Sequence, residues 1–194
     1  MLNSIIQIVS DALSMDIQIL TPALRVIGGI CTGNDYHTST LITLNILNVF
    51  DAILGHSEPS VRKEIYFALS NIAAGNCGHA NAMLNHAVIR KVLAGFTEQQ
   101  HEIKLETVFV IRNLSKTLDE NTDILKLLAH NFFYHANFLL SEQILEPKIL
   151  IKTLKIIFSL CKAGSLEHVP EENPVWQALE DSGCLDVIER LQHY

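Results

Sequence analysis

Two stretches of the chain repeat the same trio of an acid, an aromatic residue and an asparagine. The trios are Glu64, Phe67 and Asn71, and Glu106, Phe109 and Asn113. In both, the spacing is three and then four residues, which places the three side chains on one face of an α-helix. Such a face is either ordinary solvent-exposed surface or a strip that holds a ligand.

The chemistry of the trio suits an extended basic peptide. An asparagine amide both donates and accepts, so one side chain can bond the C=O and the N–H of a peptide unit. An aromatic face attracts a cation by about 0.5–2 kcal/mol. An exposed carboxylate–cation pair adds only ~0–1 kcal/mol, so several trios must act together. Three alternatives stay open: backbone bonding by the asparagines, core packing by the phenylalanines, and acids that merely favour a helix start.

Composition excludes several classes of protein. The chain has 194 residues, of which 48% are hydrophobic and 18% charged, and this balance favours a folded domain over disorder. A net charge of −7 makes nucleic acid a poor candidate partner and a basic partner a better one. The N-terminus has no signal-peptide pattern, and no apolar run reaches the ~18 residues of a membrane span. We therefore expect neither nucleic acid nor membrane as a partner.

The elements that carry the trios recur along the chain. Apolar residues repeat at intervals of three and four almost throughout, with Gly and Pro at the breaks, so we expect an all-α fold. Four stretches align on Gly29, Asn71, Asn113 and Ser159, at intervals of 42, 42 and 46 residues. A period near 42 with three helices per unit is typical of an armadillo-repeat solenoid, a right-handed superhelix.

The expected organisation is a single armadillo-repeat domain over residues 1–194, with about four repeats. The third helices of these repeats are expected near 17–33, 59–75, 101–117 and 146–163. The chain reads as if it started and stopped within a repeat. We therefore expect either a fragment of a longer protein or one that caps its ends by dimerising.

Three blocks of sequence resemble the importin-α family of nuclear-import adaptors, in the C-terminal half of its armadillo array. The block TPALRVIGGICTGND resembles the family's P-A-L-R-x-x-G-N-I-x-T-G-x-D. The block RKEIYFALSNIAAG resembles K-E-x-x-W-x-x-S-N-I-x-A-G, and EDSGCLDVIERLQHY resembles E-x-x-G-G-L-D-x-I-E-x-L-Q. Residues 119–165 match only in their periodicity.

The resemblance implies a function and a set of binding residues. The family's third helices line a concave groove that holds nuclear localisation signals, and this part of the array forms the minor site. The implied peptide-binding residues are Arg25, Gly33, Thr38, Glu64, Phe67, Ser70, Asn71, Glu106, Phe109 and Asn113. The implied partners are cargo proteins with basic signals, importin-β and an export receptor, and the implied location is the cytoplasm and the nucleus.

The sequence also departs from the family pattern. Phenylalanine replaces tryptophan in both trios, which offers cations a smaller and weaker aromatic face. Gly29 and Ser159 stand where the family has asparagine, and Lys155 stands at an aromatic position, where it would repel a basic ligand. We therefore expect a weak or altered site. The alternative is a divergent armadillo scaffold that binds another protein and no import signal.

Catalytic and metal sites are not expected. The chain has none of the motifs of a nucleophile elbow, a phosphate loop or a zinc protease, so we expect no enzyme and no cofactor. The nine histidines, including the pairs His79 with His86 and His130 with His135, lack nearby ligands at metal-binding spacing, and we expect them at the surface. The four cysteines are widely spaced among apolar or small residues, and we expect buried, reduced thiols.

Overall fold

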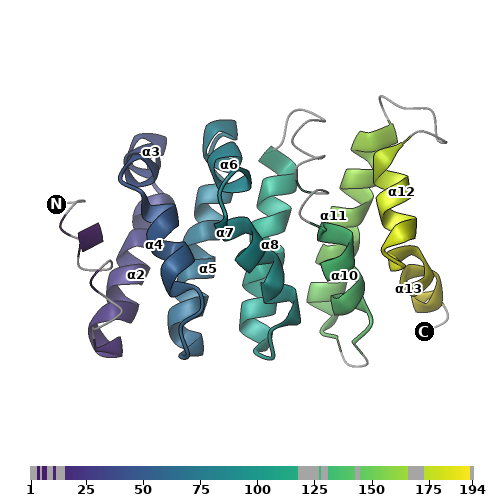
Figure 1. Cartoon of the computed structure of the whole chain (residues 1–194), viewed down its shortest axis with the longest axis horizontal. Coiled ribbons are helices and arrows are strands. Elements are labelled where there is room, and N and C mark those ends of the chain that lie inside the picture. The colour runs from purple at the N-terminus through teal and green to yellow at the C-terminus, as the bar shows by residue number, and fades with distance from the viewer. Residues whose placement is uncertain are drawn as a thin grey trace.

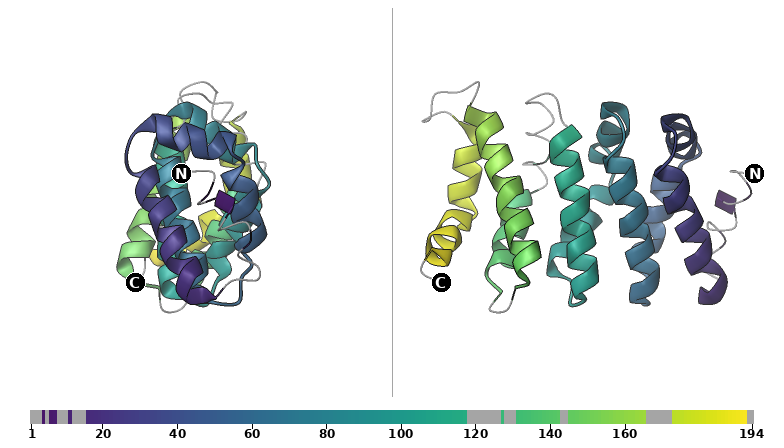
Figure 2. Two further views of the ribbon diagram at one scale, coloured as in Figure 1. Left: turned by 90° about the vertical axis from the view of Figure 1, so that its left-hand side faces the viewer. Right: turned by 180° about the vertical axis from the view of Figure 1, so that it is seen from behind.

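Four long helices stand side by side in one row and define the length of the molecule (Figures 1 and 2). They are α2 (Ile17–Cys31), α5 (Pro59–Ala73), α8 (His101–Thr117) and α11 (Pro147–Ser165). The computed structural model describes residues 16–117, 131–142, 145–165 and 173–192, together with residues 4, 6, 7, 11 and 127. The two ends of the chain lie at opposite ends of the row (Figure 1).

Shorter helices form a second layer against this row (Figure 2, left). They are α3 (Asp35–Thr43), α4 (Ile46–Ile53), α6 (Cys77–Leu84), α7 (Val88–Ala94), the 3₁₀ turn η2 (Gly95–Thr97), α10 (Phe132–Leu140), α12 (Pro174–Asp181) and α13 (Cys184–Leu191). Two short helices precede each of α5 and α8, so the repeating unit has three helices. The described elements are all helical, and the prediction of an all-α solenoid is confirmed.

Side-chain caps fix where these helices begin. The carboxylate or amide oxygens of Asp16, Asn34, Asn76 and Asn173 each accept from a backbone N–H in the first turn of the helix that follows. Each contact satisfies one of the donors that a helix start leaves free, and it is typically worth about 1 kcal/mol. Proline stands in the first turn of α5 and of α12, where its missing N–H costs nothing.

The corner that leads into the second helix of a repeat uses left-handed backbone. Asn45 precedes α4 with φ 65°, Asn131 precedes α10 with φ 59°, and Gly183 precedes α13 with φ 68°. Asparagine and glycine tolerate this region at low cost, whereas a β-branched residue does not. The sequence thus meets the same backbone demand at comparable places in three repeats.

One hydrophobic core runs between the two layers along the whole row. Third-helix residues such as Ile27, Leu69 and Ile111 have no exposed surface, and neither do Phe50 and Phe96 of the shorter elements. Burial of each such side chain contributes roughly 1.5–3 kcal/mol. Because each repeat packs its core against the next, the solenoid aligns its third helices and so presents their outer residues in a row.

Ion pairs at equivalent positions fix the register between repeats. Arg62 on α5 pairs with Glu98 at 3.0 Å, and Lys104 on α8 pairs with Glu142. Both cations are largely buried, and each reaches the segment that precedes the next third helix. None of the described helices is long and apolar enough to cross a membrane.

Candidate functional site

The candidate site is the exposed side of the row formed by α2, α5, α8 and α11, which we call the third-helix face (Figure 2, right). Both trios lie on these helices, the first on α5 and the second on α8. Their aromatic and asparagine side chains are half-buried, so each is anchored on one side and open on the other. The stacking of repeats therefore brings the two trios together as successive steps on one surface.

The two asparagines make the same contact in successive repeats. Asn71 Nδ2 donates to the carbonyl oxygen of Gly28 at 3.1 Å, and Asn113 Nδ2 donates to the carbonyl oxygen of Ser70 at 2.9 Å. In both cases the acceptor lies 43 residues earlier, on the preceding third helix. An amide has a second N–H and an accepting oxygen, so each side chain keeps hydrogen-bonding capacity for a ligand. The backbone contact fixes where that capacity points.

The acid of the first trio already has a cationic partner within the chain. Arg25 on α2 donates from Nε to Glu64 Oε1 at 3.1 Å, and its Nη2 contacts the same oxygen. The Glu64 side chain is only 11% exposed, whereas the Arg25 side chain is 69% exposed. The carboxylate is therefore held in place, and the arginine that covers it is the more movable member of the pair.

The two phenylalanines have different neighbours. The Phe67 ring packs on α2 at Gly28, where a β-carbon would come within 2.8 Å of Phe67 Cδ1. Gly28 thus leaves the space that the ring occupies, and the peptide-binding residues implied by the sequence did not include this glycine. Lys152 on α11 lies over the Phe109 ring, with Nζ 4.4 Å from the ring centroid. The aromatic position on α8 is therefore occupied by a cation of the chain itself.

Burial raises the pKa of Glu106, the acid of the second trio. Its side chain is half-buried, and the nearby charge of Glu64 acts in the same direction, while Lys63 and Lys148 oppose the shift. The two acids therefore share one electrostatic environment, although they belong to different repeats. A cationic ligand between them would relieve both the repulsion and the cost of burial.

Three residues implied by the family resemblance lie off the strip. The Ser70 hydroxyl is buried and donates to the Phe67 carbonyl of its own helix. Thr38 is buried on α3 rather than placed on a third helix. Gly33 is exposed between the end of α2 and the start of α3. A role of these three in peptide binding stays a prediction, and the main chain of Ser70 is the part that meets the next repeat.

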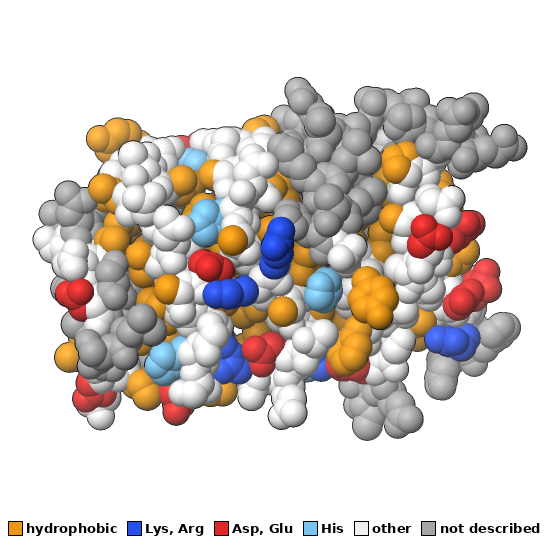
Figure 3. Space-filling view, in the orientation of Figure 1, with side chains coloured by type: hydrophobic (Ala, Val, Ile, Leu, Met, Phe, Trp, Pro, Cys, Tyr) orange, Lys and Arg blue, Asp and Glu red, His pale blue; other side chains and the backbone are white. Residues whose placement is uncertain are grey.

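The part of the third-helix face between α8 and α11 is basic, which the trios did not predict. Arg112 and Lys116 come from α8, and Lys148, Lys152 and Lys155 come from α11. A pocket of about 200 Å³ lies here, lined by Arg112, Ser115, Lys116, Lys155, Ile156, Phe158 and Ser159. On the opposite face of the molecule, basic and acidic side chains are interspersed (Figure 3). A signal was present in the sequence, since the lysines of α11 recur at four and three residues.

Two expectations about single residue types need correction. His79 is buried rather than at the surface. Its Nε2 lies 2.7 Å from the Ser39 hydroxyl of the preceding repeat. Cys77 is exposed at the first position of α6, while Cys31 and Cys184 are buried and Cys161 is half-buried. No group of three metal-binding side chains occurs among the described residues.

Comparison with curated proteins finds two plant relatives, both from Oryza sativa subsp. japonica. Importin subunit alpha-2 is 26% identical over 124 residues, which cover 61% of this chain and 24% of that protein. Importin subunit alpha-1a is 36% identical over 72 residues, which cover 37% of this chain and 14% of that protein. The matched part thus spans a quarter or less of the relatives' length. No family model matches the chain.

Comparison with solved structures finds designed armadillo repeat proteins. One, designed for modular peptide recognition, superposes with a TM-score of 0.72 at 21% identity and covers 100% of this chain and 93% of its own. Another, solved in complex with the peptide (KR)4, has a TM-score of 0.71 at 22% identity and covers 98% and 91%.

The fold and the comparisons together define an armadillo-repeat solenoid. Its repeats are importin-α-like, in agreement with the resemblance of the sequence blocks. The proteins that the chain resembles, importin alpha subunits and designed armadillo repeat proteins, are binding scaffolds rather than enzymes.

Proposed function

We propose that the chain binds extended peptides along its third-helix face and acts as part of a nuclear-import adaptor. The ligand would be a basic nuclear localisation signal, with one Lys or Arg side chain at the trio on α5. The single observation that carries this proposal is the repeated contact of Asn71 and Asn113 with the preceding third helix. Two amides held in the same way, one repeat apart, offer a peptide backbone evenly spaced hydrogen bonds.

The dimensions of a solenoid fit this mode of binding. Packed helices lie 8–10 Å apart, which corresponds to about three residues of an extended peptide. An asparagine on each of two adjacent third helices can therefore bond backbone groups about three residues apart. Side chains of the ligand would then fall between the helices, at Phe67 and Glu64 on α5.

Binding at the α5 trio requires an exchange of cations. A ligand lysine or arginine would take the place of Arg25 at the Glu64 carboxylate, and Arg25 is exposed enough to move aside. Because one ion pair replaces another, the net gain is small, ~0–1 kcal/mol. Affinity would then come mainly from the asparagine contacts and from the ring of Phe67. The proposed site is therefore a weak one.

A second candidate function is favoured by the contact of Lys152 with Phe109. The ring on α8 is covered by the chain's own cation, and more positive charge surrounds it. A divergent scaffold that binds a different protein would need no open aromatic position there. The two functions differ in whether a basic peptide binds at the two asparagines.

Importin-β and an export receptor are further partners under the same proposal. Importin subunits alpha are the curated relatives, and by this relationship the chain would work with importin-β and an export receptor and would move between cytoplasm and nucleus. Cargo proteins with basic signals would be the ligands of the third-helix face.

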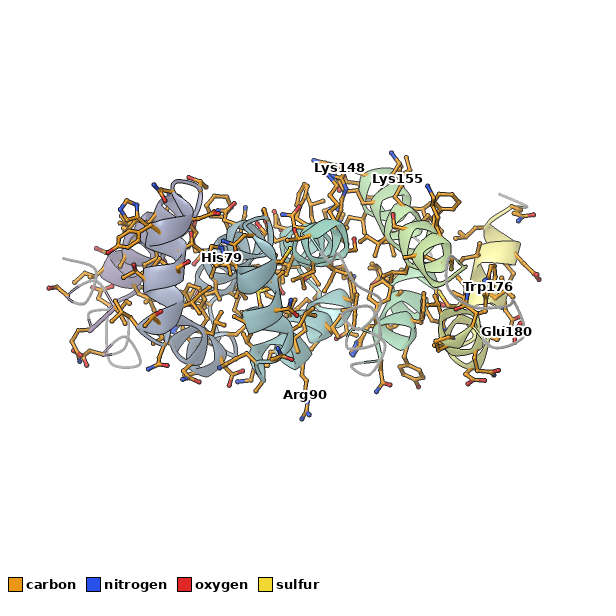
Figure 4. All side chains as sticks on the ribbon, turned by 90° about the horizontal axis from the view of Figure 1, so that it is seen from above. His79, Arg90, Lys148, Lys155, Trp176 and Glu180 are labelled. Atoms are coloured by element: carbon orange, nitrogen blue, oxygen red, sulfur yellow. The ribbon has the colours of Figure 1, made fainter. Side chains whose placement is uncertain are left out.

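The test is a fluorescence-anisotropy titration with a labelled Lys/Arg-rich peptide at low salt and at about 0.15 M salt. The variants are Asn71→Ala/Asn113→Ala and, separately, Glu64→Gln, which leaves both asparagine contacts intact. Arg90→Ala is the control, because Arg90 projects from the opposite side of the molecule (Figure 4). Circular dichroism confirms that each variant is folded.

Saturable binding that the double variant loses, that Glu64→Gln weakens and that Arg90→Ala leaves unchanged is the expected result. Binding that ignores all three changes and vanishes with salt would reject the signal-binding function and leave the divergent scaffold.

A further inference from the structure

We infer that the section of the third-helix face between α8 and α11 is a binding site for an acidic peptide segment, rich in Asp and Glu. The five cations that define this basic section are Arg112, Lys116, Lys148, Lys152 and Lys155. This site is distinct from the α5 trio, and its five cations take no part in the proposed import function, although both sites adjoin Asn113.

The cations of α11 form a stripe along one face of that helix. Lys148, Lys152 and Lys155 are separated by four and three residues, so they stack on successive turns. Lys148 and Lys155 are exposed and project from the same side of the molecule, away from Arg90 on the far side (Figure 4). The α11 sequence contains lysines and no Asp or Glu. The lysines of the stripe therefore have no acidic partner within their own helix.

The cations of α8 face this stripe across the gap between the helices. Arg112 and Lys116 follow Glu106 on α8, and no acid lies between Glu106 and the end of the helix. All four other members of the section act on Lys152 and, after the larger effect of burial, lower its pKa. No carboxylate of the described residues lies within ion-pair distance of any of the five. Like charges are thus held together without an ion pair, and Glu106 is the acid whose charge acts on Lys148.

The basic section also contains a pocket that cationic side chains line. Arg112, Lys116 and Lys155 line the pocket of about 200 Å³, together with the hydroxyls of Ser115 and Ser159. The Ser115 hydroxyl donates to the Arg112 carbonyl and the Ser159 hydroxyl to the Lys155 carbonyl, so the guanidinium and ammonium groups are the donors left for a ligand. Such cationic donors at one small pocket suit a carboxylate, which accepts several hydrogen bonds. The pocket is large enough for the end of a Glu side chain.

Two neighbours of the pocket favour a peptide over other anions. Phe158 lines it and is 70% exposed, so it offers an apolar surface to a residue beside the acid. Asn113 lies on α8 one residue beyond Arg112, and its remaining amide groups can bond a peptide backbone.

The test uses the full 194-residue chain and a fluorescein-labelled nine-residue peptide of alternating Glu and Ser. Its matched control peptide has Gln in place of every Glu. Lys148→Gln/Lys155→Gln removes two charges from the basic section. Arg90→Gln/Arg190→Gln removes two exposed charges elsewhere and serves as the matched control variant. A single-stranded oligonucleotide of nine thymidines is titrated in parallel, and thermal melts confirm that both variants are folded.

We expect saturable binding of the Glu peptide at low salt and none of the Gln peptide. The Lys148→Gln/Lys155→Gln variant should bind about tenfold more weakly, since each exposed ion pair changes the dissociation constant by a few-fold. The Arg90→Gln/Arg190→Gln variant should bind like the original chain. Equal loss in both double variants, tighter binding of the oligonucleotide, or no binding of the Glu peptide would each overturn the inference. A Lys/Arg peptide that still binds in that case would leave the proposed import function untouched.

Discussion

Lys152 on α11 occupies the face of the Phe109 ring on α8, with 4.4 Å between its Nζ and the ring centroid. The two residues lie in different repeats, and the contact exists only because the third helices stack. In the proposed mode of binding, one ligand cation lies at Phe67 on α5, and a second could use the Phe109 ring only by displacing Lys152. Under this proposal, Lys152 competes with a ligand cation at α8, and Arg25 does so at Glu64 on α5.

Removal of the Lys152 charge should leave the face of the Phe109 ring free for a ligand cation. Lys152→Gln is expected to strengthen binding of a Lys/Arg-rich peptide by about two- to fivefold, because a ligand cation then gains the contact with Phe109 and meets less positive charge. The measurement is anisotropy at low salt. Lys162→Gln is the control, since it makes the same charge change on the same helix without contacting the ring. Equal effects of both changes would show that only net charge matters.

The corner at Gly95 should tolerate no side chain. A β-carbon there would collide with the hydroxyls of Thr107 and Tyr66, so Gly95→Ala is expected to destabilise the fold by about 1–3 kcal/mol. Gly29 on α2 has open space around its β position, and Gly29→Ala should instead stabilise by roughly 0.5–1 kcal/mol. Denaturant midpoints measure both. Shifts of the same sign would contradict the packing at Gly95.

Stability should depend on the ionisation of Glu106. Burial raises its pKa in the folded state above the unfolded value, so the folded chain holds this proton more tightly. Stability from this group is therefore present at low pH and is lost as the carboxyl ionises. Glu106→Gln should melt at a higher temperature than the original chain at pH 7.

The advantage of Glu106→Gln should shrink to nothing as the pH falls below the usual carboxyl range. Glu102→Gln is the matched control, because Glu102 is exposed in the first turn of the same helix. A Glu106→Gln variant that melts lower than the original chain at pH 7 would mean that its charge is stabilising.

The four thiols should react in a fixed order. Burial raises the pKa of Cys31 and of Cys184 to about 12, so neither forms a thiolate near pH 8. Cys77 is exposed and should react first with Ellman's reagent, and Cys77→Ser should abolish this fast phase. Cys31 and Cys184 should react only after denaturation. Labelling of Cys31 as fast as Cys77 in the folded protein would contradict the position of α2 in the core.

The fold was largely predictable because it depends on patterns that repeat. Apolar periodicity gave the helices, and the aligned residues Asn71 and Asn113 gave the repeat, since both signals depend on local sequence. Burial of His79 was not predictable, because it depends on Ser39 in the preceding repeat. The exposure of Cys77 at a helix start likewise depends on where that helix packs rather than on its apolar neighbours.

The candidate site was predictable only in part. The shared face of each trio follows from helical geometry alone. The pairs Arg25 with Glu64 and Phe109 with Lys152 depend on the stacking of neighbouring repeats and on the chosen rotamers, and no local spacing encodes these. The spacing of the α11 lysines could have indicated the basic section, but only with the cations of α8 placed beside them.

The central claim is that the two asparagine side chains hold a peptide on the third-helix face. The most direct measurement is a series of ¹H–¹⁵N NMR spectra during titration with an unlabelled Lys/Arg-rich peptide, with the side-chain amides of Asn71 and Asn113 assigned by mutation. The account predicts saturating shifts of both side-chain amides, while the amide of Asn48 on α4 stays in place. Shifts that spread over acidic surface elsewhere and leave Asn71 and Asn113 unchanged would contradict it.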